Sequence, residues 1–178
     1  MVPGVRGGTA GALALLALLV YLLLTGGGDD GGGSPSGGGP GASSREPVAA
    51  RVVRAIDGDT IEVAIDGGTD DVRYIGVDTP ETVKPGEPVQ CYGPEASAFN
   101  HELVDGETVR LVFDRELRDV YGRLLAYVYA DGEFVNAELV RGGYARTLEI
   151  PPNTAEADRL NAIERAAADA GVGLWGAC

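Results

Sequence analysis

Two short acidic segments carry the residues best suited to chemistry. Asp57-Gly58-Asp59-Thr60 lies at the junction of two β-branched runs, and Asp78-Thr79-Pro80-Glu81 directly follows another such run. If the corresponding strand ends are adjacent, three or four carboxylates converge. Carboxylate and carbonyl oxygens with water are the ligands that a hard cation such as calcium requires. For a single Asp-Gly-Asp-Thr segment, a turn-forming role is the competing interpretation.

The histidine and cysteine content excludes other common site types. His101 is the only histidine, and Cys91 and Cys178 are the only cysteines. A Cys/His zinc site is therefore excluded, as is a histidine-based triad or general base. Two arginines complement the acids instead: Arg73, inside a predicted strand where an unpaired charge is costly to bury, and Arg123, just after a turn.

The two arginines indicate that the acids could act on a phosphate group. Arginine presents a planar, permanently charged fork that matches phosphate oxygens. Two arginines, a divalent ion and a carboxylate suffice for phosphodiester hydrolysis, because the cations stabilise charge at phosphorus while the carboxylate activates water. Each arginine also has a purely structural alternative, an ion pair within a strand for Arg73 and a surface turn for Arg123.

Alternating and β-branched runs predict the strands that position these residues. We expect strands at 51–56, 60–65, 72–77, 108–113 and 124–129, with turns at Asp57-Gly58 and at Asp66-Gly67-Gly68. Helices are expected at 94–103, at 135–140 and at 155–170, the last with Thr154 as its N-cap and Gly171 as its stop. This order predicts an α+β domain, a five-stranded OB-type β-barrel with three helices.

The first 45 residues form two segments outside the domain predicted at 46–178. Residues 1–25 combine Arg6 with an apolar run at 10–25, a pattern typical of a secretory signal peptide or a signal anchor, and both readings stay open. Residues 26–45, rich in glycine, serine and proline, are expected to be a disordered linker. Either reading places the domain outside the cytoplasm, extracellular or anchored to the cell-surface membrane through residues 10–25.

The charge is strongly negative, with 14 lysines and arginines against 27 aspartates and glutamates and a net charge of −13. Lys84 is the single lysine. Such a surface is typical of a protein kept soluble by carboxylates in concentrated salt, with an acidic protein of ordinary salinity as the alternative. It argues against non-specific attraction to nucleic acid, but not against arginines gathered in a cleft.

Five stretches of the chain resemble the staphylococcal nuclease (thermonuclease) family. They are VRAIDGDT (53–60), RYIGVDTPET (73–82), YGPEASAF (92–99), DVYGRLLAY (119–127) and VNAELV (135–140). The resemblance covers about residues 50 to 175 and implies a staphylococcal nuclease-like barrel with three helices. It further implies a calcium-dependent endonuclease acting on DNA and RNA and leaving 3′-phosphate ends. A secreted or membrane-anchored homologue is expected, with a haloarchaeal source suggested by the acidity.

The resemblance also implies a set of metal-binding residues. Asp59 and Asp78 match the calcium-binding aspartates of the family. Thr79 matches the residue whose main-chain carbonyl completes the protein ligands, and Asp57 matches an aspartate close to the metal.

Catalytic and substrate-binding roles follow from the same resemblance. Glu81 matches the proposed general base, and Arg73 and Arg123 match the two phosphate-binding arginines. Tyr121 matches a tyrosine beside the bound nucleotide.

The chain departs from the family pattern around the nucleotide. Val120 stands where the family has a lysine, and two nucleotide-flanking tyrosines would fall near Thr147 and Glu149. Because aromatic stacking is worth about 1–3 kcal/mol per base, we expect weaker substrate binding rather than impaired chemistry.

An export signal and an even number of cysteines favour a Cys91–Cys178 disulfide, with two free thiols as the alternative. Two other functions remain in view. A non-catalytic OB module would not need the acids and arginines together, and an extracellular calcium-binding or adhesion domain would not need Arg73 and Arg123. A monomer is the default expectation.

Overall fold

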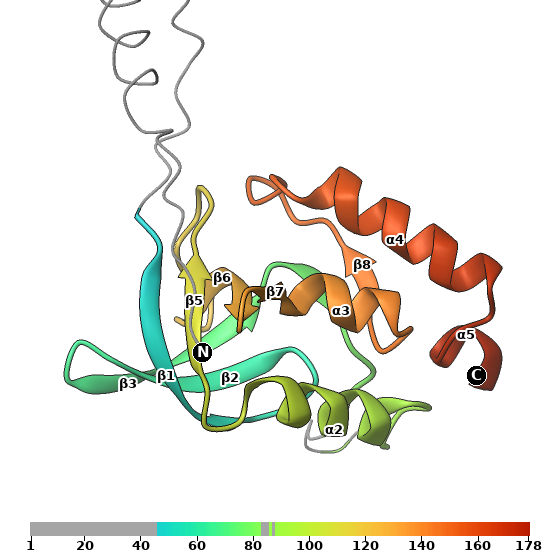
Figure 1. Cartoon of the computed structure of the whole chain (residues 1–178), viewed down its shortest axis with the longest axis horizontal. Coiled ribbons are helices and arrows are strands. Elements are labelled where there is room, and N and C mark those ends of the chain that lie inside the picture. The colour runs from blue at the N-terminus through green and yellow to red at the C-terminus, as the bar shows by residue number, and fades with distance from the viewer. Residues whose placement is uncertain (1–45, 83–85, 87) are drawn as a thin grey trace, which may run out of the picture. The chain divides into compact units, whose positions relative to one another are not determined.

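The computed structural model describes residues 46–82, 86 and 88–178 (Figure 1). The signal or anchor segment predicted at 10–25 and the linker predicted at 26–45 lie outside these residues. Within the described part of the chain, no helix combines the length and apolar character needed to cross a membrane.

Five of the described strands close into the predicted barrel. They are β1 (Val48–Ala55), β2 (Thr60–Ile65), β3 (Gly68–Tyr74), β5 (Thr108–Val112) and β6 (Leu124–Ala130). Strand β1 pairs antiparallel with β2 and β5, β2 with β3, and β5 with β6. A parallel pairing of β3 with β6 closes the barrel. Its interior is filled mainly by β-branched and aromatic side chains, including Ile61, Val63, Val72, Tyr74, Val109, Leu111 and Val128.

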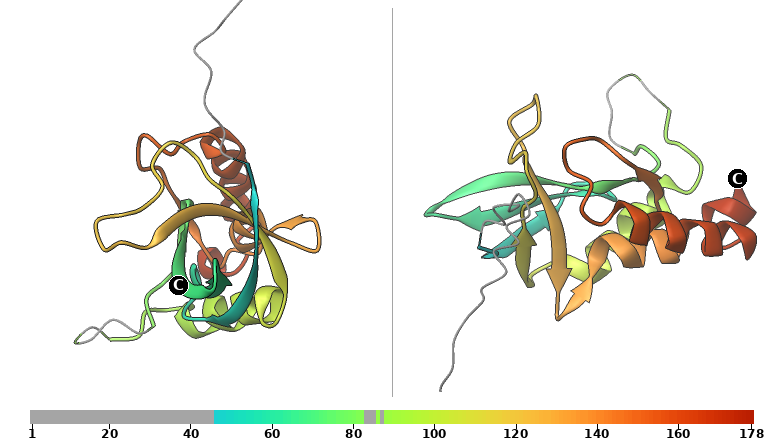
Figure 2. Two further views of the ribbon diagram at one scale, coloured as in Figure 1. Left: turned by 90° about the vertical axis from the view of Figure 1, so that its left-hand side faces the viewer. Right: turned by 90° about the horizontal axis from the view of Figure 1, so that it is seen from above.

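The three predicted longer helices are present, and the middle one packs against both of the others. They are α2 (Gly93–Val104), α3 (Val135–Arg141) and α4 (Ala157–Asp169), and a short α5 (Leu174–Ala177) follows. Helix α2 contacts β1, whereas α3 contacts α4, α2 and β6 (Figures 1 and 2). Two residues, β7 (Glu133–Phe134), extend the sheet beyond β6. The α+β class and the barrel architecture are thus confirmed.

The third strand differs from the prediction, because it breaks where a single strand was expected at 72–77. Strand β3 ends at Tyr74, and the chain resumes as β4 (Gly76–Asp78), which pairs with β8 (Arg146–Leu148) rather than with the barrel. Gly76 adopts a φ of 80°, open mainly to glycine. Strand β8 was missed altogether, because three residues carry too little periodicity to predict a strand.

The predicted start of the helix expected at 155–170 is also wrong. Helix α4 begins at Ala157 after Glu156, whereas Thr154 was the expected N-cap. Thr154 instead accepts the amide proton of Ala157 through its main-chain carbonyl, at 3.1 Å. The cause is tertiary, since Asn153 makes reciprocal 2.8 Å bonds with the backbone of Glu116 and holds this segment as a loop. Gly171, with a φ of 63°, follows the end of α4 as predicted.

The strand break is held by a fully buried asparagine on α3. Asn136 Nδ2 donates to the carbonyl of Ile75 at 2.8 Å, and its Oδ1 accepts the amide proton of Val128 at 2.9 Å. This side chain therefore supplies the main-chain bonds that the interrupted strand lacks, and it sets the direction in which β4 leaves the barrel.

Replacing Asn136 by alanine is expected to lower the free energy of unfolding by about 2–5 kcal/mol, because two buried main-chain groups lose their partner. Urea unfolding of the two proteins measures the change. The same substitution at Asn161, a half-buried residue of α4, is the matched control and should shift stability by less than about 0.5 kcal/mol. Equal effects at the two sites would contradict this role for Asn136.

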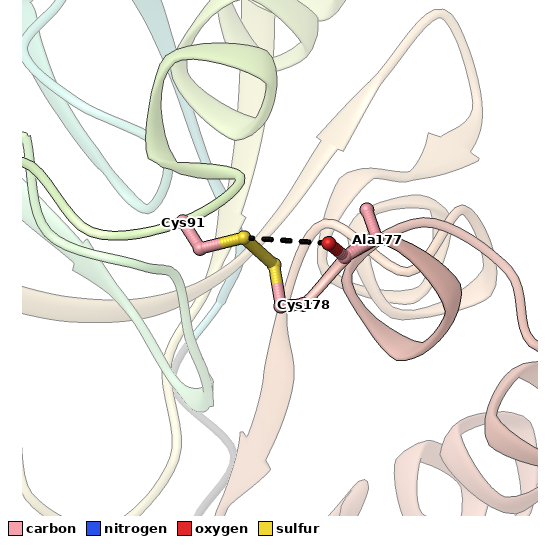
Figure 3. The surroundings of a disulfide bond; sticks show 3 residues. All are labelled: Cys91, Ala177 and Cys178. Atoms are coloured by element: carbon pink, nitrogen blue, oxygen red, sulfur yellow. Dashed lines mark hydrogen bonds between the residues drawn. A yellow bond between two sulfur atoms is a disulfide. The ribbon is translucent and has the colours of Figure 1, made fainter.

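The predicted disulfide is present between Cys91 and Cys178, whose Cα atoms lie 6.0 Å apart (Figure 3). It ties the end of α5 to the segment that leads into α2. The disulfide closes the long loop between Cys91 and Cys178, and closing such a loop stabilises a fold by up to about 4–5 kcal/mol in the chain-entropy model.

Candidate active site

One polar pocket brings together every site residue that the sequence singled out. Its lining consists of Asp57, Asp59, Arg73, Asp78, Thr79, Pro80, Glu81, Tyr121 and Arg123. These residues come from the β1–β2 turn, the end of β3, β4 with the residues after it, and the turn before β6. The barrel therefore joins segments up to 66 positions apart in the chain, from residue 57 to residue 123, into a single site.

Asp59 is the hub of the pocket and is only 5% exposed. Its Oδ2 accepts hydrogen bonds from the Thr79 amide at 2.8 Å and the Thr79 hydroxyl at 2.9 Å, and it lies 3.1 Å from an Arg73 nitrogen. Its main-chain carbonyl accepts from the amide of Tyr74 at 2.9 Å. One buried carboxylate thus links the β1–β2 turn to β3 and to the segment after β4.

The turn that carries Asp57 and Asp59 is held by close packing and by a buried asparagine. A side chain at Gly58 would lie 2.6 Å from the Thr79 hydroxyl, so only glycine lets the turn approach this closely. Asn100 Nδ2 donates to the carbonyl of Asp57 at 2.8 Å, and Asn100 Oδ1 accepts from the Tyr74 hydroxyl at 2.9 Å. Sequence reasoning missed Asn100, because nothing in its neighbourhood on α2 marks it as buried.

Arg73 occupies the centre of the carboxylates. Its guanidinium donates to the carbonyls of Tyr74 at 3.2 Å and Val77 at 2.9 Å, and to Asp78 Oδ1 at 2.9 Å. Because the side chain is largely buried, these charge-assisted bonds fix it firmly. The ion pair that was the structural alternative for Arg73 is therefore present, and the same side chain lines the pocket.

Arg123 is oriented by Asp119, a residue for which no separate role was predicted from the sequence. Asp119 Oδ2 accepts from Arg123 Nε at 2.8 Å, and its Oδ1 accepts the amide protons of Tyr121 and Arg123. Behind this turn, Arg118 makes two bonds to Asp70 on β3 and donates to the Gly122 carbonyl. The turn is thus braced against the barrel while Tyr121 remains 82% exposed.

Burial, with a smaller contribution from neighbouring acids, raises the pKa of two of the carboxyl groups. Burial, together with the charge of Asp59, raises the pKa of Asp57 to about 6. Burial also raises the pKa of Asp78, against the opposing effect of Arg73 and with a contribution from the charges of Asp59 and Glu81. A site that disfavours its own negative charge in this way gains when a cation is bound.

The Asp57 shift predicts a pH-dependent stability in the absence of metal. A carboxyl whose pKa rises on folding binds more protons in the folded state between pH 4 and 6, so stability falls as pH rises through this range. In EDTA, Asp57→Asn should therefore raise the free energy of unfolding at pH 8 by about 1–3 kcal/mol and change it little at pH 3.5. Urea titrations at the two pH values measure this. Asp71→Asn, at an exposed position of β3, is the control, and a gain at pH 3.5 as large as at pH 8 would contradict the explanation.

The donor set of the pocket fits a hard divalent cation. Among the described residues, no three His, Cys, Asp or Glu side chains form a metal-binding group by themselves. Calcium, however, takes main-chain carbonyls and water as readily as carboxylates. The carboxylates of Asp59 and Asp78, both within 3.1 Å of Arg73, and the carbonyl of Thr79 are such oxygen donors on the wall of the same pocket.

A family model described as "Staphylococcal nuclease homologue" matches residues 71–177, more than half of the chain. The chain belongs to the staphylococcal nuclease family. The match begins within β3 and extends through α5, so it includes Arg73, Asp78, Glu81 and Arg123.

Relatives in the family include thermonucleases and endonucleases. The chain is 42% identical to the thermonuclease of Staphylococcus hyicus over 135 residues, 76% of this chain and 80% of that protein. It is 45% identical over 133 residues to the SPbeta prophage-derived endonuclease YokF, and 48% identical over 124 residues to the endonuclease YncB, both of Bacillus subtilis (strain 168). These matches cover 74% and 68% of this chain, but only 45% and 59% of the two Bacillus proteins.

Of the departures from the family pattern noted in the sequence, Val120 lies beside an apolar groove. Arg73, Tyr121 and Arg123 are shared between this groove and the polar pocket, and Val120, Leu148 and Ile150 add apolar side chains. Thr147 lies elsewhere, since its amide and hydroxyl donate to Glu164 of α4. Leu148 at the end of β8 and Ile150 just after this strand line the groove, whereas the two family tyrosines were expected near Thr147 and Glu149.

Proposed function

We propose that this chain is a calcium-dependent endonuclease that hydrolyses phosphodiester bonds of DNA and RNA and leaves 3′-phosphate ends. The observation that carries the proposal is the single pocket in which carboxylates at Asp59, Asp78 and Glu81 face two arginines. The names of its relatives, thermonuclease and endonuclease, support the same class of reaction.

The proposed metal ligands are Asp59, Asp78 and the carbonyl of Thr79, with Asp57 beside them. Calcium bound there would supply positive charge for the phosphate and lower the pKa of water. Arg73, which ion-pairs with both aspartates, holds their carboxylates in place. Asp57 lies beside these ligands, and burial together with the charge of Asp59 raises the pKa of Asp57 to about 6 against the opposing effect of Arg73.

The proposed chemistry divides between one base and two arginines. Glu81 accepts a proton from water as the water oxygen bonds to phosphorus, the bond from phosphorus to O5′ breaks, and the leaving O5′ takes a proton from solvent water. The products are a 3′-phosphate and a 5′-hydroxyl. Arg73 and Arg123 donate hydrogen bonds to the non-bridging phosphate oxygens, which gain charge in the transition state.

The apolar groove is the proposed place for a nucleotide base. Tyr121 offers one aromatic face, while Leu148 and Ile150 offer aliphatic contact in place of further aromatic rings. Aliphatic side chains bury a base but do not stack on it, so single nucleotides should bind more weakly than to a tyrosine-bearing relative. The 94% exposed Val120 adds no charge for a terminal phosphate.

We further propose that the domain acts outside the cell, either secreted or tethered to the membrane through residues 10–25, and as a monomer. The disulfide supports an oxidising compartment. A flexible linker of the length of residues 26–45 has a root-mean-square span of about 25 Å. A tethered domain would therefore reach substrates close to the membrane surface.

Digestion of denatured DNA and of RNA, with calcium and with EDTA, tests the function. We expect cleavage of both substrates in calcium, none in EDTA, and fragments whose 3′ ends are phosphorylated and therefore resist polymerase extension until treated with a phosphatase. Binding without cleavage would favour the non-catalytic OB module. Calcium binding without any affinity for nucleic acid would favour the calcium-binding or adhesion domain. Cleavage in EDTA would refute the role of the metal.

A further inference from the structure

We propose that residues 90–93, here called the clamp, position Glu81 for catalysis, and that the Cys91–Cys178 disulfide fixes the clamp. The inference rests on the proposed role of Glu81 as general base. It assigns to Gln90 and to the disulfide a function in positioning, in addition to any contribution to stability.

The clamp touches the main chain of Glu81 from both sides. The side-chain oxygen Oε1 of Gln90 accepts a hydrogen bond from the main-chain amide of Glu81 at 3.0 Å. The main-chain amide of Gln90 donates to the main-chain carbonyl of Glu81 at 2.9 Å. A side chain at Gly93 would lie 3.1 Å from the carbonyl oxygens of both Pro80 and Glu81. The backbone of the clamp therefore packs directly against residues 80–82 and leaves Glu81 little room to shift.

The disulfide attaches the middle of the clamp to a rigid part of the fold. Cys91 is bonded to Cys178, and its Sγ lies 3.8 Å from the carbonyl oxygen of Ala177 (Figure 3). Helix α5 is itself seated on the end of α3, where the Leu174 amide donates to the Gly143 carbonyl at 2.9 Å. A side chain at Gly143 would come within 2.1 Å of the Val172 carbonyl oxygen, so the two backbones are in tight contact.

The same part of the fold also positions a proposed metal ligand. Asp78 pairs with Arg146 in the β4–β8 ladder, and the Arg146 guanidinium lies 4.1 Å from the centre of the Trp175 ring on α5. Asp78 is thus held by β8, and Glu81 by α5 through the disulfide. Asp78 and Glu81, which only Thr79 and Pro80 separate in the chain, are therefore both positioned by β8 and α5 at the C-terminal end of the fold.

The hydrogen bond between Gln90 and Glu81 should matter more for catalysis than for the stability of the fold. Gln90 is exposed, so its hydrogen bond to Glu81 should contribute little to the free energy of unfolding. Catalysis is more sensitive, because displacement of a catalytic group by about 1 Å can cost as much as ~10²-fold in rate. Loss of the Gln90 contact should therefore lower kcat while the melting temperature and KM change little.

Gln90→Met tests the side-chain contact, because methionine keeps the length of glutamine and removes the acceptor. We expect kcat to fall about 10-fold, with KM within about twofold and the melting temperature within about 2 °C of the wild type. Gln90→Glu, which keeps a carbonyl-type acceptor, should restore kcat to within about threefold. Val89→Ala, an exposed neighbour, is the matched control. A wild-type kcat in Gln90→Met, or no recovery in Gln90→Glu, would overturn the role of Gln90.

The disulfide is tested with the double variant Cys91→Ser/Cys178→Ser, assayed at a temperature where circular dichroism shows it fully folded. We expect a fall in kcat of about 10-fold at unchanged KM. Full activity in this folded variant would overturn the positioning role of the disulfide.

Gln90→Met and the double variant Cys91→Ser/Cys178→Ser are then each combined with Glu81→Gln. If they act through Glu81, they should have less than about a twofold effect there, because groups that act as a unit are not additive. A full additional loss would overturn the inference and leave the proposed function intact. Wild-type activity of Glu81→Gln itself would instead refute the general base, and the inference with it.

Discussion

Glu81→Gln is expected to lower kcat by about 10²–10⁴-fold, because the amide is nearly isosteric with the carboxylate but cannot accept a proton from water. Glu81 lines the polar pocket together with the proposed metal ligands and the two arginines. Its main chain is bonded to Gln90 in both directions, and glutamine leaves those bonds in place. The loss should therefore appear in kcat, measured on denatured DNA with saturating calcium.

Calcium affinity distinguishes a base from a ligand at this position. If Glu81 acts as the base, isothermal titration should give the same calcium dissociation constant for both proteins within about threefold. A parallel loss of calcium binding would show that Glu81 is a metal ligand instead. Glu95→Gln, at an exposed position in the first turn of α2, makes the same chemical change and should retain full activity.

Arg123→Lys is expected to lower kcat by about 10²–10³-fold. Lysine keeps the positive charge but loses the planar fork, so it cannot bind Asp119 through one edge and phosphate through the others. In the structure Asp119 accepts a hydrogen bond from Arg123 Nε, which is not one of the two terminal nitrogens. Because this pair is partly exposed, the free energy of unfolding should change by less than about 1 kcal/mol.

A lysine at Arg118 provides the matched control for this variant. Arg118 belongs to the same turn, pairs with Asp70 and lies outside the lining of the polar pocket. Its replacement should reduce kcat by less than about threefold, since an exposed ion pair contributes at most about 1 kcal/mol. If the two lysine variants lost the same activity, the effect would come from disorder of the turn and not from the lost phosphate contact.

Acidic charge and phosphate binding are reconciled by where the arginines lie. The net charge of −13 lies entirely on residues 46–178, because the four charges of the first 45 residues cancel, whereas Arg73 and Arg123 both line one pocket. Long-range attraction to nucleic acid is therefore weak, and recognition depends on short-range contacts. We expect the affinity for substrate to depend less steeply on salt than that of a basic nuclease.

The five barrel strands, the three helices and the acidic and arginine site residues were predicted from sequence, because each leaves a local trace. Strand alternation, the glycine-containing turns and the stop at Gly171 are readable over a few residues. The motifs around Asp59, Asp78 and Arg123 lie at strand ends and turns, where the barrel gathers side chains. The Cys91–Cys178 bond was predicted from the even number of cysteines and from the predicted export signal, without any information on distance.

Tertiary structure alone decided the rest. The break at Ile75 depends on Asn136, 61 residues away, and the loop before α4 depends on the bonds of Asn153 to Glu116. The choice of Leu148 and Ile150 as groove residues depends on β8, which exists only because β4 leaves the barrel to pair with it. Such features depend on single contacts between segments that are far apart in the chain. A contact of this kind leaves no periodic pattern in the sequence from which it could be predicted. Local chemistry therefore determined which residues form the site, and long-range packing determined how they are held.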